Sequence, residues 1–131
     1  MILVVRLGLP PVELSPNQRA HRLDKARAAA DYRQEARLMG WGAKVEAHWE
    51  RPARARVSLL FGLKDTRAPH VRTLTYHPRD ADNAVGAVKA LIDGLRDAEI
   101  IVDDNWAALV LGSVTATYED GPWVEVTIEP V

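Results

Sequence analysis

The chain has 131 residues, 47% of them hydrophobic and 27% charged, which is typical of a soluble globular protein of about one domain. It has no cysteine, which excludes disulfides, thiolate metal sites and a cysteine nucleophile, and no apolar run approaches the roughly 18 residues of a membrane-spanning helix. We therefore expect a single domain over residues 1–131, in the cytoplasm and without a membrane partner.

The formal net charge is -1, but the charges are unevenly distributed along the chain. Residues 1–79 hold 15 of the 17 basic side chains and 7 of the 18 acidic ones, whereas residues 80–131 hold 2 basic and 11 acidic side chains. This asymmetry suggests a polyanion-binding surface beside a cation-binding pocket. Alternatively, the two halves pair with each other through ordinary surface charges.

The N-terminal half predicts strand, helix, strand and strand. Residues 1–9 indicate a strand and not a signal peptide, because no basic region precedes the apolar run and no small-residue cleavage site follows it. Residues 21–39, rich in Ala, Arg and Leu, predict a helix that the "GWG" sequence at 40–42 ends. Residues 55–62 and 71–77 have the composition of two strands.

The C-terminal half predicts helix, strand and strand. Asp82 or Asn83 is a favourable N-cap for an amphipathic helix that reaches Ala98. Residues 107–118 and 123–129 predict two strands around "EDGP", which is typical of a hairpin turn. The order of elements predicts an α+β domain with a mixed, mostly antiparallel sheet and two main helices.

Aspartates stand at both ends of the second helix. A helix over residues 83–98 is about 24 Å long, and the next six residues cover about 20 Å if they return extended. Asp103 and Asp104 can therefore come back to Asp80 and Asp82.

Carboxylates crowded in this way repel one another, and a divalent cation removes the repulsion. Magnesium prefers hard oxygen ligands, so an Asp-x-Asp pair with a further aspartate suits a phosphoryl-transfer site. Lys89 lies two helical turns after Asp82 and leans toward the N-terminus, where its ammonium can contact a phosphate. The residues also allow simpler interpretations: Asp-x-Asp-Asn as a turn and cap, Lys89 with Asp93 as an exposed pair, and "VDDN" as a turn.

Three segments, "RDADN" (79–83), "VKALIDGLRDA" (88–98) and "IIVDD" (100–104), together resemble the signature of the RusA family of Holliday junction resolvases. The N-terminal "LPP" and "SPNQRAH" are similar to that family's opening. The resemblance implies a RusA-like fold and a magnesium-dependent homodimeric endodeoxyribonuclease, with manganese able to substitute. Such an enzyme nicks two strands symmetrically at a four-way DNA junction, in recombination and repair.

By this resemblance, Asp80 and Asp82 are paired metal ligands and Asp104 is the third ligand, with Asp103 as a weaker candidate. Lys89 matches the essential catalytic lysine. The chain departs from the family's pattern by about one extra turn, "AVG", before Lys89. It also has Glu99 where a glycine often ends the helix, so Glu99 must avoid the left-handed conformation or bear its cost.

A junction resolvase must also hold several phosphate backbones, which requires basic side chains on a broad surface. The candidates for DNA binding are Arg19, His21, Arg22, Arg33, Arg37 and Arg79. Each is also compatible with a solvated surface position. We expect the tryptophans in the core or an interface and not as base-stacking residues: Trp41, Trp49, Trp106 and Trp123.

Two other functions fit the same residues. One is a nuclease with a broader preference for flapped or branched DNA. The other is a DNA-binding dimer that keeps the fold without cleaving.

Overall fold

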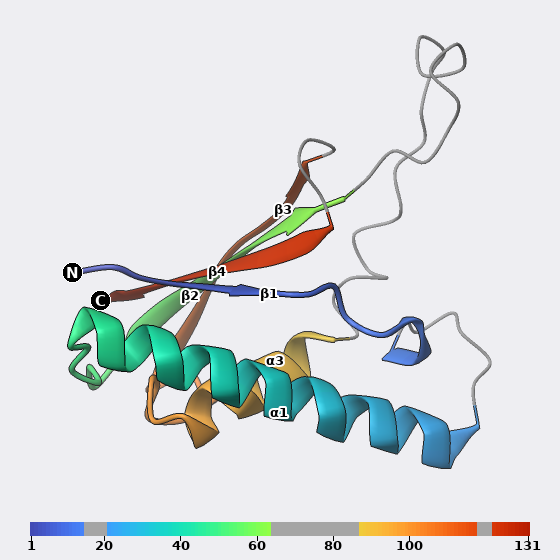
Figure 1. The fold of residues 1–131 in the computed structure, drawn as a ribbon. Coiled ribbons are helices and arrows are strands. Elements are labelled where there is room, and N and C mark those ends of the chain that lie inside the picture. Colours follow the sequence, from blue (N-terminus) through green and yellow to red (C-terminus); the bar gives the residue numbers. More distant parts are fainter. Residues whose placement is uncertain (15–20, 64–86, 118–121) are drawn as a thin grey trace, which may run out of the picture.

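The computed structural model describes residues 1–14, 21–63, 87–117 and 122–131. Within these ranges the chain has a mixed α+β fold, in which two α-helices pack on one face of a four-stranded sheet (Figure 1). No helix in these ranges combines the length and apolarity needed to cross a membrane. The fold class predicted from the sequence is confirmed.

The sheet is mixed and mostly antiparallel. Its strands are β1 (Leu3–Leu7), β2 (Ala55–Gly62), β3 (Leu109–Thr117) and β4 (Trp123–Pro130), in the order β1-β4-β2-β3. Strand β4 pairs antiparallel with β1 and β2, whereas β3 runs parallel to β2. Four of the predicted strands are present, and the one predicted at 71–77 lies outside the described residues.

The predicted hairpin between β3 and β4 is wrong. The two strands are antiparallel in direction, but β2 lies between them. Parallel neighbours require a long crossover, and helix α3 (Val88–Asp97) lies in the connection from β2 to β3. Strand β3 is therefore placed on one side of β2, which leaves the other side for β4. A turn signal such as "EDGP" does not report which strands become neighbours.

Helix α1 (Arg22–Ala47) is longer than predicted, because "GWG" at 40–42 does not end it. Gly40 is buried, and a Cβ at this position would lie 2.7 Å from Ile100 Cδ1. The glycine thus permits the segment after α3 to pack closely against α1. This packing offsets the cost of a glycine inside a helix, which is about 1 kcal/mol relative to alanine. The helix ends at His48, which adopts the left-handed conformation with φ 51°.

The core lies between the sheet and the two helices. Alternate residues of β1, β2 and β4 are buried on the helix-covered face, as period-2 alternation requires. The fully buried side chains on this face include Leu3, Leu59 and Ile128. Helix α1 contributes Tyr32 and Ala36, and the core continues through α3 and the residues after it.

A short 3-10 helix, η1 (Val12–Leu14), follows β1. Leu14 packs at the margin of the core, beside the N-terminal half of α1. Leu14 is the last described residue before the range 21–63 begins.

Candidate active site

Helix α3 has one buried face and one polar face. Leu91, Leu95 and the following Ala98 are almost completely buried, as the predicted apolar face requires. Lys89, Asp93 and Arg96 share the opposite face because they stand four and seven residues apart. The predicted N-caps, Asp82 and Asn83, lie outside the described residues.

The chain reverses direction after α3 through Glu99. This residue adopts the left-handed conformation, with φ 60°, and thus bears a cost that a glycine would avoid, on the order of 1–2 kcal/mol. Its N–H donates to the Arg96 carbonyl at 3.0 Å, and the Ile100 N–H donates to the Leu95 carbonyl at 3.0 Å. These two bonds form a Schellman motif, and burial of Ile100 and Leu95 accompanies it.

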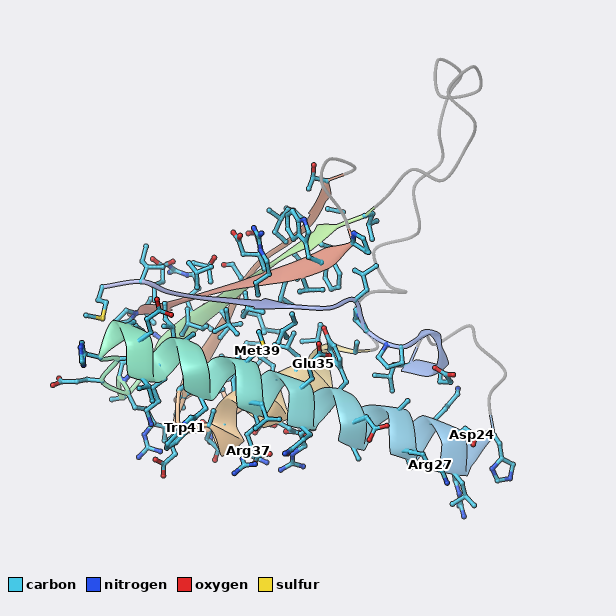
Figure 2. The ribbon with its side chains drawn as sticks, viewed as in Figure 1. Asp24, Arg27, Glu35, Arg37, Met39 and Trp41 are labelled. Atoms are coloured by element: carbon cyan, nitrogen blue, oxygen red, sulfur yellow. The ribbon has the colours of Figure 1, made fainter. Side chains whose placement is uncertain are left out.

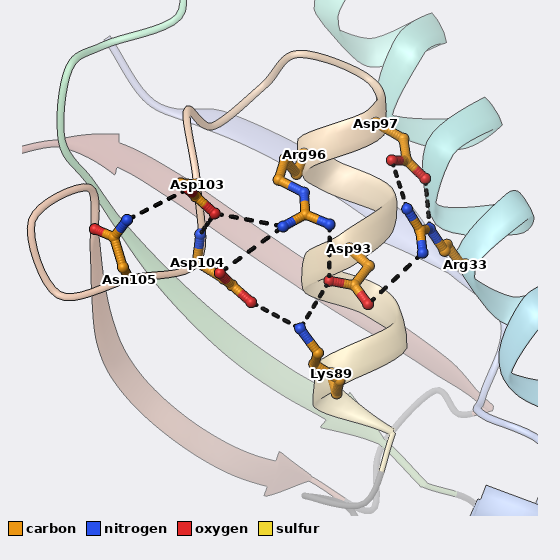
Figure 3. A network of polar contacts seen from close by, with 8 residues as sticks. All are labelled: Arg33, Lys89, Asp93, Arg96, Asp97, Asp103, Asp104 and Asn105. Carbon is orange, nitrogen blue, oxygen red and sulfur yellow. Dashed lines mark hydrogen bonds and ion pairs between the residues drawn. The ribbon is translucent and has the colours of Figure 1, made fainter.

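Burial fixes the path of the returning segment. Ile100 and Ile101 are both fully buried, and the indole Nε1 of Trp49 donates to the Ile100 carbonyl at 3.1 Å. The segment is irregular and not the extended strand that the sequence analysis assumed. It nevertheless carries Asp103 and Asp104 back along α3 (Figure 3).

The ammonium of Lys89 bridges two carboxylates. Its Nζ donates to Asp104 Oδ2 at 2.7 Å and to Asp93 Oδ1 at 3.1 Å. The first contact joins residues 15 positions apart, so the reversal at Glu99 brings together two residues that the sequence analysis selected. The second contact is the local pair that the simpler interpretation expected, and the two coexist (Figure 3).

These contacts shift two protonation equilibria. The hydrogen bonds to Asp104 and then to Asp93 raise the pKa of Lys89. The hydrogen bond from Lys89 lowers the pKa of Asp104. Lys89 therefore stays protonated and Asp104 stays ionised at neutral pH. The Lys89 side chain is still 70% exposed, so its ammonium is accessible to a ligand.

Arg96 forms a second cationic bridge. Its guanidinium lies 3.6 Å from Asp93, 3.4 Å from Asp103 and 3.8 Å from Asp104. The Asp103 carboxylate also accepts from the Asp104 N–H at 2.8 Å and from Asn105 Nδ2 at 3.3 Å. Asp103 thus stabilises the local turn, and its ranking below Asp104 as a metal ligand stays a prediction.

Arg33 on α1 contacts the same face of α3. It donates twice to Asp97, from Nε at 2.6 Å and from Nη2 at 2.9 Å, and lies 3.9 Å from Asp93. The approach is possible because Gly94 faces α1, where a Cβ would lie 2.5 Å from the Arg33 carbonyl oxygen. Arg33 therefore joins two helices, and its predicted contact with DNA stays a prediction.

The other predicted DNA-binding residues differ in their positions. His21 is the N-cap of α1, and its Nδ1 accepts from the Leu23 N–H at 3.1 Å. Arg22 and Arg37 are exposed, and Arg37 lies on the side of α1 that faces away from the sheet (Figure 2). The Arg37 guanidinium makes one long hydrogen bond, 3.4 Å, to Gln34.

Several predicted site residues lie outside the described residues, namely Arg19, Arg79, Asp80 and Asp82. In the part of the chain that the structure describes, no three His, Asp or Glu side chains are grouped so that they could hold a metal ion. Asp104 is therefore the one predicted metal ligand whose surroundings are described, apart from the weaker candidate Asp103.

Sequence reasoning paired Asp93 with Lys89 but gave it no part in the site, and it gave Arg96 no role. Both could have been placed there from their spacing, because they follow Lys89 on one helical face. Trp106 was expected in a core or interface, and because its side chain is 77% exposed it does not lie in the core; its place in an interface stays a prediction. Trp49 is buried as expected, whereas Trp41 is 51% exposed.

A hollow of about 410 Å³ lies beside Lys89, between η1, the N-terminal half of α1 and the start of α3. Its wall is formed by small or apolar side chains together with Arg33, Lys89 and Asp93.

No known protein-family model matches the chain, and no curated protein matches it significantly.

Proposed function

We propose that the chain is a magnesium-dependent endodeoxyribonuclease that resolves four-way DNA junctions, as its resemblance to the RusA family implies. The observation that supports the proposal is the contact of 2.7 Å between Lys89 Nζ and Asp104 Oδ2. The resemblance requires this lysine and this aspartate in one site, although α3 and a chain reversal separate them in sequence.

Asp104 fits a hard divalent cation. The hydrogen bond from Lys89 lowers the pKa of its carboxyl group, which favours the ionised form, and the carboxylate offers about four lone-pair sites, of which Lys89 takes one. In the proposal Asp80, Asp82 and Asp104 hold magnesium, for which manganese substitutes. When bound, magnesium supplies charge neutralisation at the phosphate and a hydroxide-like nucleophile at neutral pH.

Lys89 acts on the phosphate in this proposal. The hydrogen bonds to Asp104 and Asp93 raise the pKa of its ammonium, which favours the charged form, so the side chain acts by charge and not as a general base. An exposed ammonium beside ionised Asp104 can donate to a non-bridging phosphate oxygen and stabilise the negative charge that develops there. The Asp93 carboxylate contacts this ammonium, and the Arg96 guanidinium in turn contacts Asp93.

The DNA backbone is held by exposed basic residues of α1. Arg22 and Arg37 remain candidates because they are exposed, and Arg37 lies on the outer side of the helix (Figure 2). Arg33 is not available in the same way, because two short hydrogen bonds hold it on Asp97. We further propose a homodimer, since two equivalent sites can cut the two equivalent strands of a junction.

The proposal is tested with a synthetic four-way junction beside matched duplex and flap substrates, with and without magnesium. The variant is Asp82→Asn, which keeps side-chain size and removes one proposed ligand charge. Paired symmetric nicks that require magnesium and disappear in the variant support the proposal. Equal cutting of flaps and junctions would instead identify a broader branched-DNA nuclease, and tight junction binding without cleavage under any metal would identify a non-cleaving binder.

A further inference from the structure

The carboxylate of Asp93 lies where three cationic side chains meet. Its oxygens are 3.1 Å from Lys89 Nζ, 3.6 Å from Arg96 Nη2 and 3.9 Å from Arg33 Nη1 (Figure 3). The Asp93 side chain is only 13% exposed, whereas the Lys89 side chain is 70% exposed. Asp93 is therefore the fixed member of the pair.

This fixed carboxylate limits the freedom of a flexible lysine. A lysine side chain loses much of its rotamer freedom when it is ordered, so one exposed ion pair holds it weakly. Two carboxylates on different segments define one place for the ammonium, between Asp93 on α3 and Asp104 on the returning segment. Without Asp93, the ammonium would be held by Asp104 alone.

The position of Asp93 is itself determined from two sides. Arg96 reaches it from the next turn of α3, and Arg33 reaches it from α1, across the close contact at Gly94. The packing of α1 on α3 is thereby connected to the place where the Lys89 ammonium lies.

We propose that Asp93 is a positioning residue, which acts through Lys89 by holding its ammonium against Asp104. The inference rests on the proposed function, because it assigns to Asp93 a part in the same phosphodiester hydrolysis. Asp93 need not touch DNA. Its loss is expected to lower kcat and to leave the affinity for DNA unchanged.

The chain offers a matched control in Asp97. This aspartate lies one turn after Asp93 on α3 and pairs with Arg33, but it has no contact with Lys89 among the interactions of the described residues. The variants Asp93→Asn and Asp97→Asn therefore each remove one acidic partner of Arg33, and only the first removes a partner of Lys89.

The first measurement is junction cleavage by these two variants, with Asp93→Glu as the conservative replacement. We expect Asp93→Asn to lower kcat on the order of 10- to 100-fold, the effect of a displaced catalytic group, with KM within about twofold of the wild type. Asp93→Glu keeps the charge and should restore part of kcat, and Asp97→Asn should retain kcat. An equal fall of kcat in Asp93→Asn and Asp97→Asn would mean that general destabilisation causes the effect, and this would overturn the inference.

The second measurement does not depend on activity. The chain has four lysines, so the ammonium resonance of Lys89 can be assigned by substitution, and its scalar coupling to the carboxyl carbon of Asp104 reports the hydrogen bond. The coupling should have full size in the wild type and Asp97→Asn and be clearly smaller in Asp93→Asn, where Asp104 alone holds the ammonium. A coupling of wild-type size in folded Asp93→Asn would overturn the inference. A wild type that cuts no junction, while the coupling is still reduced in Asp93→Asn, would contradict the proposed function alone.

Discussion

Arg33 on α1 holds Asp97 near the C-terminal end of α3 through two parallel hydrogen bonds, of 2.6 Å and 2.9 Å. The pair connects the two helices, although its two residues are 64 positions apart in the sequence. A planar guanidinium suits this geometry, because its fork matches the two carboxylate oxygens.

The pair predicts a pH-dependent contribution to stability. The hydrogen bond from Arg33 lowers the pKa of Asp97 below its usual value of 3.8. A lowered carboxyl pKa contributes stability that is fully present above pH 3.8 and is lost as the pH falls through the folded-state value. Asp97→Asn should therefore lower the Tm by roughly 1–5 °C between pH 5 and 8. Thermal unfolding of both proteins should give Tm values that converge as the pH falls through the lowered folded-state pKa of Asp97; a difference that persists at the acid end of the series would contradict the assignment.

The contact at Gly94 predicts a large effect from a single methyl group. A Cβ at this position would lie 2.5 Å from the Arg33 carbonyl oxygen and 2.6 Å from Ala36 Cβ, so one helix must move. We expect Gly94→Ala to lower the free energy of unfolding by about 1–3 kcal/mol, as overpacking does. Gly42→Ala is the control, because a Cβ there meets nothing within 4 Å and should stabilise α1 by about 0.5–1 kcal/mol. Urea unfolding should therefore show a lower free energy of unfolding for Gly94→Ala and a higher one for Gly42→Ala than for the wild type.

Two arginines of α1 should respond differently to substitution. Arg37 is exposed on the outer side of the helix, whereas Arg33 is held by Asp97. We expect Arg37→Ala to weaken junction binding and to reduce the slope of log K against log salt by about 1. Arg33→Ala should leave that slope within about 0.3 of the wild type and lower the Tm instead. A salt series of binding isotherms distinguishes the two, and an equal loss of slope would contradict the different placement.

Trp106 has the most exposed tryptophan side chain in the described part of the chain, so it is a candidate for contact with an unpaired base. It is 77% exposed and follows Asp104 by two positions. Stacking on one base is worth about 1–3 kcal/mol, so Trp106→Ala should weaken junction binding about 5- to 150-fold. The free energy of unfolding should change by about 0.5 kcal/mol or less, as for other exposed positions. Trp41→Ala, also at an exposed indole, provides the comparison; an equal loss of affinity in both would show that position beside Asp104 is irrelevant.

Local pattern was sufficient for much of the fold. Local apolar composition predicted the four strands, and the spacing of Leu91, Leu95 and Ala98 predicted the buried face of α3. Simple lengths of helix and return segment also predicted that Asp104 would come back along the helix that carries Lys89. These features depend on residues close in sequence, or on geometry that the chain length fixes.

Features set by distant contacts were not predictable. Gly40 continues α1 because Ile100 packs against it, and β3 leaves β4 because both pair with β2. In the same way, nothing local to Arg33 indicates that it binds Asp97 instead of solvent or phosphate. The positions of Asp80 and Asp82 lie outside the described residues, so their meeting with Asp104 stays a prediction.

The central claim is that Lys89 and Asp104 belong to the site of a metal-dependent nuclease. The most direct test is single-turnover cleavage of a four-way junction in magnesium by the wild type, Asp104→Asn and Asp103→Asn. We expect the wild type to make paired symmetric nicks, Asp104→Asn to lose on the order of 100-fold or more in rate, and Asp103→Asn to stay within about tenfold. If Asp104→Asn cuts the junction as fast as the wild type, the contact between Lys89 and Asp104 is a surface ion pair and the claim is wrong.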